Sequence, residues 1–191
     1  QLTIDRIKNK YLSKVSEDDK VNFSENLKII NNQIKQIENL VNEFSDFARM
    51  PKPILQDNDL IKIIADNISL LSQIDKQIII DFKKNQNNVV MNCDKEQISR
   101  AFFNLIKNSI ESIQEKYDKK PDFNKKISIE IISHNDHIKI ILIDNGIGFS
   151  EIKGKIKDII NPYFTTKKNG TGLGLSIVNK IINDHNGELR F

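Results

Sequence analysis

The sequence contains no tryptophan, two methionines, four prolines and a single cysteine in 191 residues. A single cysteine excludes an internal disulfide and fits a reducing compartment. Because Cys93 has no histidine or cysteine at metal-ligand spacing, we expect it to be a core thiol. No apolar run approaches the ~20 residues needed to span a bilayer, and no signal peptide is visible. The chain starts at Gln1 instead of Met, so we expect a fragment of a longer protein.

An excess of one charge is also missing, since 29 basic residues nearly balance 26 acidic ones and leave a net charge of +3. This balance argues against a nucleic-acid binder and against a membrane-surface binder. The hydrophobic share of 38% is enough for a core, and the length predicts one or two domains.

The first 50 residues have the apolar spacing of two helices, one over residues 2–15 and one over residues 23–49. The apolar positions of the longer helix recur in steps of four and three, at Phe23, Leu27, Ile30, Ile34, Ile37, Val41, Phe44 and Ala48. This heptad seam predicts a helical hairpin, and two hairpins would form a four-helix bundle, so we expect a homodimer. Alternatively, the seam packs on the other domain of the same chain.

Two prolines, Pro51 and Pro53, end the long helix, because proline lacks a backbone donor and restrains the residue before it. We therefore divide the chain into a helical stem over residues 1–50, a linker over 51–57 and a second domain over 58–191.

The second domain mixes helical and strand patterns without strict alternation. Helices are expected over residues 59–72, 95–113 and 173–184, with a weaker one over 150–160. Strands are expected over 77–82, 89–93, 127–132, 138–143 and, at the end of the chain, 188–191, with a charged loop over 114–124. This order predicts an α+β fold, a two-layer α/β sandwich with a mixed sheet and helices on one face.

Two glycine clusters, in residues 144–148 and 170–175, flank a short polar and aromatic segment. A glycine turn at the start of a helix presents backbone N–H groups to a phosphate. The spacing does not match the dinucleotide fingerprint or the Walker A loop, and the position in the chain does not match a protein-kinase glycine loop.

Asn104 and Asn108 share one face of the helix over residues 95–113 and interrupt an apolar surface. A buried amide needs partners, so the pair either packs or caps within the protein, or presents a carbonyl to a metal. A neutral amide suits Mg²⁺ when phosphates supply the negative charge.

Asp144 follows an apolar strand, where a carboxylate needs donors. The exocyclic amine of adenine is such a donor, whereas guanine has a carbonyl there, so this aspartate could select ATP over GTP. Glycines at 146 and 148 would let the backbone turn beneath the base. An ordinary Asp-Asn-Gly turn is the alternative.

Four segments occur in the order of a known family. Residues 104–109 resemble the N box, 144–148 the first G box, 162–167 the F box and 170–175 the second G box of sensor histidine kinases. Residues 43–53 resemble the junction between stem and catalytic domain in nitrogen-regulation type sensor kinases. The resemblance covers essentially the whole chain and implies a Bergerat ATP fold preceded by a dimerisation and phosphotransfer stem.

The resemblance also implies the site residues and cofactors. ATP would be bound with Mg²⁺, Asn108 would be the metal ligand and Asp144 would read adenine. The implied ATP-binding residues are Asn104, Lys107, Asn108, Asp144, Gly146, Gly148, Phe164, Thr165, Thr166, Lys167, Gly170, Thr171, Gly172, Leu173, Gly174 and Leu175. Asn104 stands where ATP-hydrolysing relatives have a glutamate base, so we expect slow hydrolysis and phosphoryl transfer to a histidine.

The acceptor histidine of this family is missing from the chain, because His134, His137 and His185 all lie outside the stem helices. We therefore expect the fragment to bind ATP without phosphorylating itself. The implied partner is the receiver domain of a response regulator, and the implied location is cytoplasmic, with any inner-membrane anchor outside this segment. An ATP-hydrolysing clamp of the same fold and a non-catalytic dimerisation module remain the alternatives.

Overall fold

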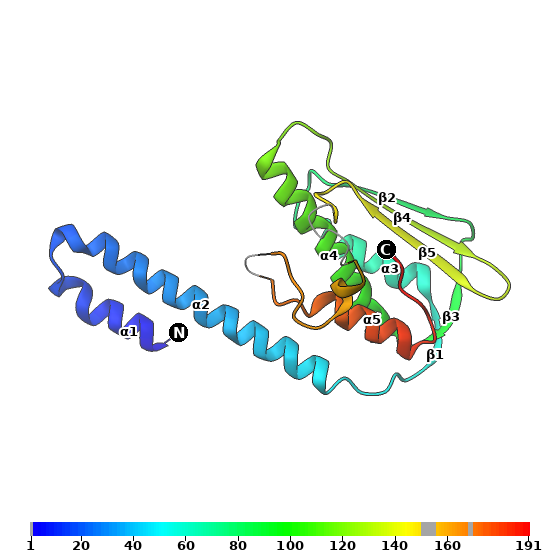
Figure 1. Cartoon of the computed structure of the whole chain (residues 1–191), viewed down its shortest axis with the longest axis horizontal. Coiled ribbons are helices and arrows are strands. Elements are labelled where there is room, and N and C mark those ends of the chain that lie inside the picture. Colours follow the sequence, from blue (N-terminus) through cyan, green and yellow to red (C-terminus); the bar gives the residue numbers. More distant parts are fainter. Residues whose placement is uncertain (1, 150–155, 168–169) are drawn as a thin grey trace. The chain divides into compact units, whose positions relative to one another are not determined.

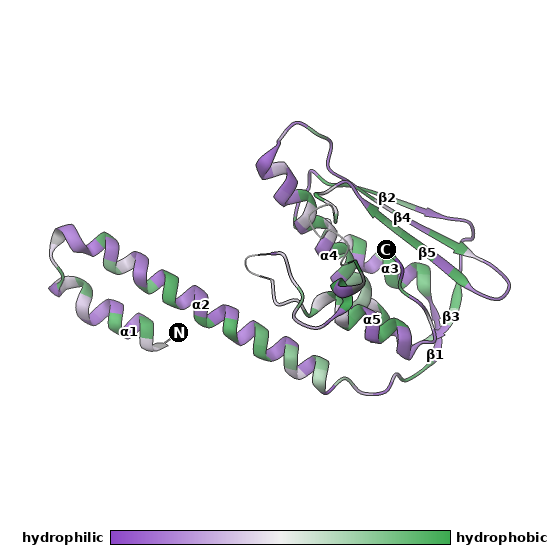
Figure 2. Cartoon of the chain, viewed as in Figure 1, coloured by the Kyte–Doolittle hydropathy of each residue, from purple (hydrophilic) through white to green (hydrophobic). Residues whose placement is uncertain are grey.

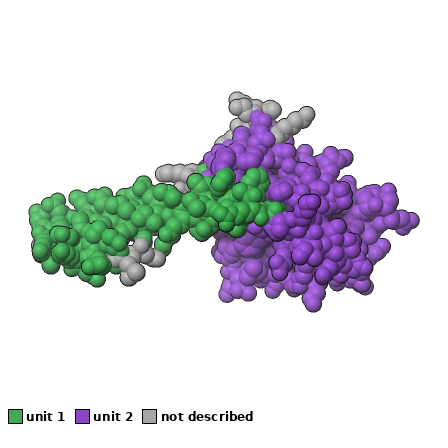
Figure 3. All heavy atoms as spheres, turned by 90° about the horizontal axis from the view of Figure 1, so that it is seen from below, with its two compact units in different colours: residues 1–50, 167–169 green, residues 51–166, 170–191 purple. Residues whose placement is uncertain are grey.

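A computed structural model describes residues 2–149, 156–167 and 170–191, which form two compact units. The first unit contains residues 1–50 and 167–169, and the second contains residues 51–166 and 170–191 (Figure 3).

The first unit is a helical hairpin (Figure 1). Helix α1 (Leu2–Tyr11) continues into the 3₁₀ turn η1 (Leu12–Lys14), and a second 3₁₀ turn, η2 (Glu17–Asp19), leads into α2 (Lys20–Ala48). Both predicted helices are confirmed, and α2 begins three residues earlier than the spacing predicted. Apolar residues recur along α2 (Figure 2). Leu27 is the only buried residue of this helix, so most of the apolar stripe is exposed.

The second unit contains two small sheets. Strand β1 (Gln56–Asp59) pairs antiparallel with β3 (Val90–Cys93). The other sheet has the order β2-β4-β5, in which β2 (Ile79–Lys84) is parallel and β5 (Ile138–Asp144) antiparallel to β4 (Lys126–Ser133). The predicted mixed sheet is therefore confirmed.

Helices α3 (Leu60–Leu71), α4 (Lys95–Lys119) and α5 (Gly174–Asp184) cover one face of the three-stranded sheet (Figure 1). Alternate side chains of β4, those of Ile127, Ile129 and Ile131, are fully buried beneath these helices. Aspartates cap two of the helices, because Asp59 accepts a hydrogen bond from Ile61 N and Asp94 accepts bonds from Glu96 N and Gln97 N. The two-layer prediction is confirmed.

The segment before β1 is held to the second unit by side chains at the start of α4. Asp94 Oδ2 accepts a hydrogen bond from Ile54 N at 2.9 Å, and Gln97 Nε2 donates to Pro51 O at 3.0 Å. Strand β1 starts at Gln56, within the residues that we expected to be linker.

Two other expectations were wrong. Helix α4 continues to Lys119, although we predicted a loop from residue 114. The extra turns carry an i, i+4 ion pair between Glu115 and Lys119 and place basic residues near the helix C-terminus, which favours helix. The chain end, residues 188–191, forms no strand, and Phe191 instead packs edge-to-face on Phe149 at 5.7 Å between ring centroids.

Shorter differences concern single element ends. The β2 strand starts at Ile79, because Asp75 Oδ1 accepts from Gln77 N and keeps the preceding residues in a turn. Of the weak helix predicted over 150–160, the 3₁₀ turn η3 (Ile156–Ile160) is present, and residues 150–155 lie outside the described part. Within the described residues, no helix combines the length and apolar character needed to cross a membrane.

Candidate functional site

The site is organised along one face of α4. Polar residues recur there every fourth position, at Asn104, Asn108, Ser112 and Lys116. Because side chains four residues apart lie above one another on a helix, these four form a line on the helix surface. Asn108 lies near the start of α5, and Ser112 and Lys116 contact the turn after β5, as described below.

At the middle of the line, Asn108 lies beside the start of α5. A Cβ built on Gly174, the first residue of α5, would lie 3.7 Å from Asn108 Nδ2. The predicted metal ligand and the second glycine cluster, far apart in the sequence, are therefore neighbours in the structure.

The N-terminus of α5 is shaped to accept an anion. Its N-cap residue, Leu173, is fully buried and makes no side-chain cap hydrogen bond, and the first turn contains no acidic residue. Helix N-termini carry N–H donors without helical acceptors and a partial positive charge, so they favour phosphate. Ser176 does not serve as a donor here, because its hydroxyl donates to Leu173 O at 2.8 Å.

In the loop before α5, Gly172 packs closely against the backbone of Tyr163 in the predicted F box segment. Gly172 has φ +72°, and a Cβ there would lie 2.4 Å from the backbone carbon of Tyr163. The two residues also share a backbone hydrogen bond, from Tyr163 N to Gly172 O at 3.0 Å. Tyr163 itself has φ +68°, which is unusual for a residue with a side chain. This close approach requires glycine at position 172.

The Asp144 turn packs on the same face of α4, one turn after Asn108. Gly146 contacts Ser112 so closely that a Cβ would lie 2.1 Å from Ser112 Oγ. Ile147 N donates to Ser112 O at 3.3 Å. The need for glycine at 146 thus comes from helix α4, whereas we had expected it from the base of a nucleotide. Gly148 has φ +66° and open space around it.

Asp144 itself is half-buried at the end of β5. Its Oδ1 accepts a hydrogen bond from Gly146 N at 2.9 Å, which orients the carboxylate relative to the turn. An ionised carboxylate has acceptor capacity for several hydrogen bonds, so Asp144 can accept one from a ligand amine as well.

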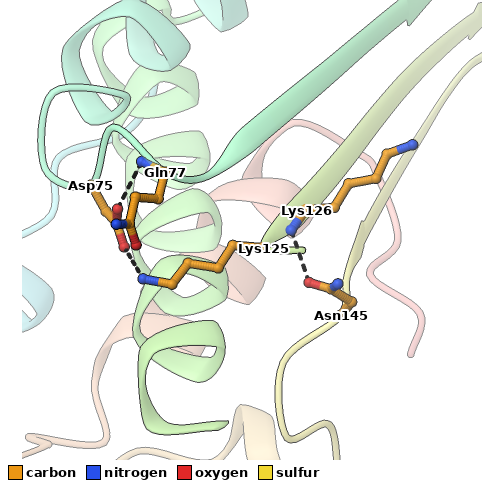
Figure 4. A network of polar contacts seen from close by, with 5 residues as sticks. All are labelled: Asp75, Gln77, Lys125, Lys126 and Asn145. Atoms are coloured by element: carbon orange, nitrogen blue, oxygen red, sulfur yellow. Dashed lines mark hydrogen bonds and ion pairs between the residues drawn. The ribbon is translucent and has the colours of Figure 1, made fainter. Parts of the chain in front are cut away.

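A buried ion pair lies beside this region (Figure 4). Lys125 Nζ lies 2.7 Å from Asp75 Oδ2, and both side chains are largely buried. The hydrogen bond from Lys125 is the main reason that the pKa of Asp75 lies below its usual value, together with the bond from Gln77 N. Next to this pair, Asn145 Oδ1 accepts from Lys126 N at 2.9 Å (Figure 4).

The remaining predicted residues have less defined roles. Phe164 and Thr171 are half-buried, Thr165, Thr166 and Gly170 are exposed, and Leu175 is half-buried in the first turn of α5. Lys107 is exposed and lies 3.9 Å from Glu111 on the same helix. Lys167 is grouped with the first unit, and its contact with phosphate stays a prediction.

No group of three or more His, Cys, Asp or Glu side chains that could hold a metal exists in the part of the chain that the structure describes. A Mg²⁺ ion here would rest on amide oxygen and on phosphate oxygens, which are ligands that it accepts. Asn108 fits that role by its place beside the start of α5.

Sequence reasoning recognised the first two members of the α4 line and missed Ser112 and Lys116. The signal was present, because the same four-residue spacing continues through both. We overlooked Lys116 because the helix was expected to end at residue 113.

Both a protein family and individual proteins of known name are similar to this chain in sequence. The sequence profile of the family described as histidine kinase-, DNA gyrase B-, and HSP90-like ATPase matches residues 93–191. The nitrogen regulation protein NtrY of Azorhizobium caulinodans is 32% identical over 190 residues, covering 98% of this chain and 24% of that protein. The chain spans less than a third of the length of such curated relatives.

Solved structures confirm the fold. The catalytic domain of histidine kinase ThkA is 28% identical, with a TM-score of 0.57 over 69% of this chain and 81% of that chain. Histidine kinase ThkA in complex with response regulator protein TrrA gives a TM-score of 0.66 at 22% identity, over 97% of this chain and 51% of that chain.

Proposed function

Because the chain belongs to the family of histidine kinase-, DNA gyrase B- and HSP90-like ATPases, we propose that it is the ATP-binding catalytic part of a sensor histidine kinase of the nitrogen-regulation type. The observation that carries this proposal is that α4 brings together Asn108, the Asp144 turn and the uncapped N-terminus of α5. When bound, ATP with Mg²⁺ supplies the γ-phosphoryl group.

The residues of the site have distinct roles in this proposal. Asp144 accepts a hydrogen bond from the adenine amine, and the N–H groups at the start of α5 bind the phosphates. Asn108 holds Mg²⁺ through its amide. The contact between Gly172 and Tyr163 keeps the loop before α5 in place, so that the phosphate site is formed before the nucleotide arrives.

Asn104 distinguishes a kinase from an ATP-hydrolysing clamp. It lies one helical turn before Asn108 and is half-buried. An amide cannot take a proton from water at neutral pH, so water in the site is not activated for attack. The γ-phosphoryl group is then available for a histidine of the stem, and afterwards for an aspartate of a response regulator.

The first unit is the partial dimerisation and phosphotransfer stem in this proposal. The exposed apolar seam of α2 supports a homodimer, since such a seam needs a second surface to bury it. The response regulator is the second partner, by analogy with the complex of ThkA and TrrA. We place this segment in the cytoplasm.

Nucleotide titration tests the ATP site. We expect ATP to bind this chain in a Mg²⁺-dependent way, and Asp144→Asn to weaken binding by at least about tenfold, because one hydrogen bond to the base is lost. The matched control is Asp118→Asn, which changes an exposed aspartate in the last turn of α4 and should leave the affinity for ATP unchanged. Absence of ATP binding by the unaltered chain would contradict the proposal and favour a non-catalytic module.

Phosphoryl transfer tests the kinase assignment. The chain extended upstream through the acceptor histidine should form an acid-labile phosphohistidine with labelled ATP, whereas the present chain should not. Rapid release of phosphate without labelled protein would indicate an ATP-hydrolysing clamp instead.

A further inference from the structure

Asn145, the residue after Asp144, is held by groups from outside its own turn. Its backbone N–H donates to Lys126 O at 3.2 Å, and its side-chain oxygen accepts from Lys126 N at 2.9 Å (Figure 4). Its side-chain Nδ2 donates to Asn124 O at 2.6 Å. These three bonds attach the turn to the start of β4.

The fourth polar group of Asn145, its carbonyl oxygen, accepts a hydrogen bond from Lys116 Nζ at 2.6 Å. Lys116 lies in the part of α4 that continues beyond the expected helix end, and it is half-buried. This bond is charge-assisted, and such bonds are shorter and stronger than those between neutral groups.

The carbonyl that Lys116 holds belongs to the same peptide group as the N–H of Gly146. That N–H donates to Asp144 Oδ1 at 2.9 Å. A peptide group is planar, so fixing its carbonyl oxygen fixes the direction of its N–H. A cation on the carbonyl also polarises the peptide and strengthens the bond that the N–H donates.

An aromatic ring lies beside the Lys116 ammonium, and this ring belongs to a pair that also contacts a second lysine. Its Nζ lies 4.7 Å from the centroid of the Phe123 ring, and that ring packs against Tyr117 at 6.0 Å between centroids. Lys125 Nζ lies 4.0 Å from the centroid of the Tyr117 ring, and the same ammonium group forms the ion pair with Asp75. The two rings thus lie between two lysines, one paired with Asp75 and the other bonded to the Asn145 carbonyl, and each lysine makes a favourable cation–π contact with one ring.

We propose that Lys116 is a positioning residue that orients the Asp144 carboxylate through the peptide group between Asn145 and Gly146, and so sets the selection of the nucleotide base. The inference rests on the proposed function, in which Asp144 reads the 6-amino group of adenine. A base with an oxygen at this position, as in guanine, is rejected only while the carboxylate is held in place.

The experiment compares three probes on the folded chain. The affinities for Mg-ATP, Mg-GTP and Mg-tripolyphosphate are measured for the unaltered chain and for Lys116→Met, which keeps the length of the side chain without its charge. We expect the preference for ATP over GTP to fall by about tenfold, because a misoriented carboxylate loses its hydrogen bond to the adenine amine. The affinity for tripolyphosphate, which contacts only the glycine side of the site, should stay within twofold.

Two further variants separate positioning from general stability. Lys116→Arg retains a charged donor and should restore most of the ATP preference. Lys119→Met removes a lysine three residues along, which is paired with Glu115, and should leave the preference unchanged. Should Lys116→Met fail to fold, Phe123→Leu serves instead, because it removes the ring beside Lys116 and should lower the preference by a smaller factor.

The outcomes distinguish this inference from the proposed function. If the unaltered chain prefers ATP and neither Lys116→Met nor Phe123→Leu changes that preference, the positioning role is wrong while the proposed function stands. An equal loss of affinity for ATP, GTP and tripolyphosphate would also overturn it, since that result indicates a general structural role. If the unaltered chain binds ATP and GTP equally, both the base-reading role of Asp144 and this inference fail.

Discussion

The helical hairpin and the α/β unit both carry strongly periodic apolar side chains, and they bury them to different extents. In the second unit, Ile127, Ile129 and Ile131 of β4 are completely buried. In the hairpin, Ile37 of the heptad seam is 60% exposed and Phe44 is 47% exposed. Periodicity therefore shows which side chains share a face, but a second surface is needed to make that face a core.

Truncating one isoleucine in each unit tests this difference most strongly. We expect Ile129→Ala to lower the free energy of unfolding by about 4 kcal/mol, because it leaves a cavity in the core. Ile37→Ala should cost less than about 0.5 kcal/mol at concentrations where the chain is monomeric. Urea unfolding followed by circular dichroism measures both. Equal losses would show that the hairpin seam is as well packed as the sheet.

Gly172→Ala is expected to have the next largest effect. The added methyl group would collide with the backbone of Tyr163 and would also occupy an unfavourable left-handed conformation, at a cost of about 3 kcal/mol. Gly148→Ala is the matched control, since φ is also positive there but no atom lies within 4 Å, and about 1 kcal/mol should be lost. Unfolding and ATP titration should both separate the two variants, and similar effects would contradict the role of the Tyr163 contact.

The ion pair between Asp75 and Lys125 should contribute a pH-dependent part of the stability of the second unit. Asp75→Asn removes the charged partner of a largely buried lysine, and we expect a loss of about 2 kcal/mol at neutral pH, as for a hydrogen bond to a charged group. Because the pKa of Asp75 is lowered in the folded state, the contribution is complete above its unfolded pKa of about 3.9. It disappears as the pH falls through the lower folded pKa.

Unfolding measured from pH 7 down to pH 2 checks the sign of this dependence. The difference between the unaltered chain and Asp75→Asn should shrink only at the acid end of that range. Asp81→Asn is the control, since the Asp81 side chain is one-third exposed and its lysine partners, at 3.6 and 3.5 Å, are about half exposed or more. A difference that stays constant with pH would contradict the ionic origin.

A charge placed in the hairpin seam should have the smallest effect on stability and still be informative. Ile37→Lys should change the free energy of unfolding of the monomer by no more than about 0.5 kcal/mol. If the seam joins two copies of the chain, the variant should lose self-association in sedimentation experiments. Dimers that persist unchanged would mean that another surface joins them.

Much of the fold followed from local pattern. The α2 stripe, the inward side of β4 and the helices capped by Asp59 and Asp94 are all readable within a few residues. Strand β1 was not, because Gln56–Asp59 contains only polar residues and is a strand through its pairing with β3.

Some residues of the candidate site could likewise be predicted from local sequence, and others could not. Asp144, Asn108 and the glycine clusters could be chosen from residue type and order. The reason for Gly146 could not, because the obstacle to a side chain is Ser112 on a helix far away in sequence. Lys116 continues the four-residue spacing of Asn104 and Asn108, but its contact with the Asn145 carbonyl could not be predicted, since the last turns of α4 resemble a charged loop.

The sequence by itself determined which side chains share a face, roughly where the helices begin, and the order of the four segments from which we propose a nucleotide site. The tertiary structure decided which groups meet, such as the Lys116 ammonium and the Asn145 carbonyl, 29 residues apart. The physical reason is the distance along the chain over which each interaction acts. Periodicity and capping arise from backbone geometry over a few residues, whereas a contact across the fold depends on how whole elements pack.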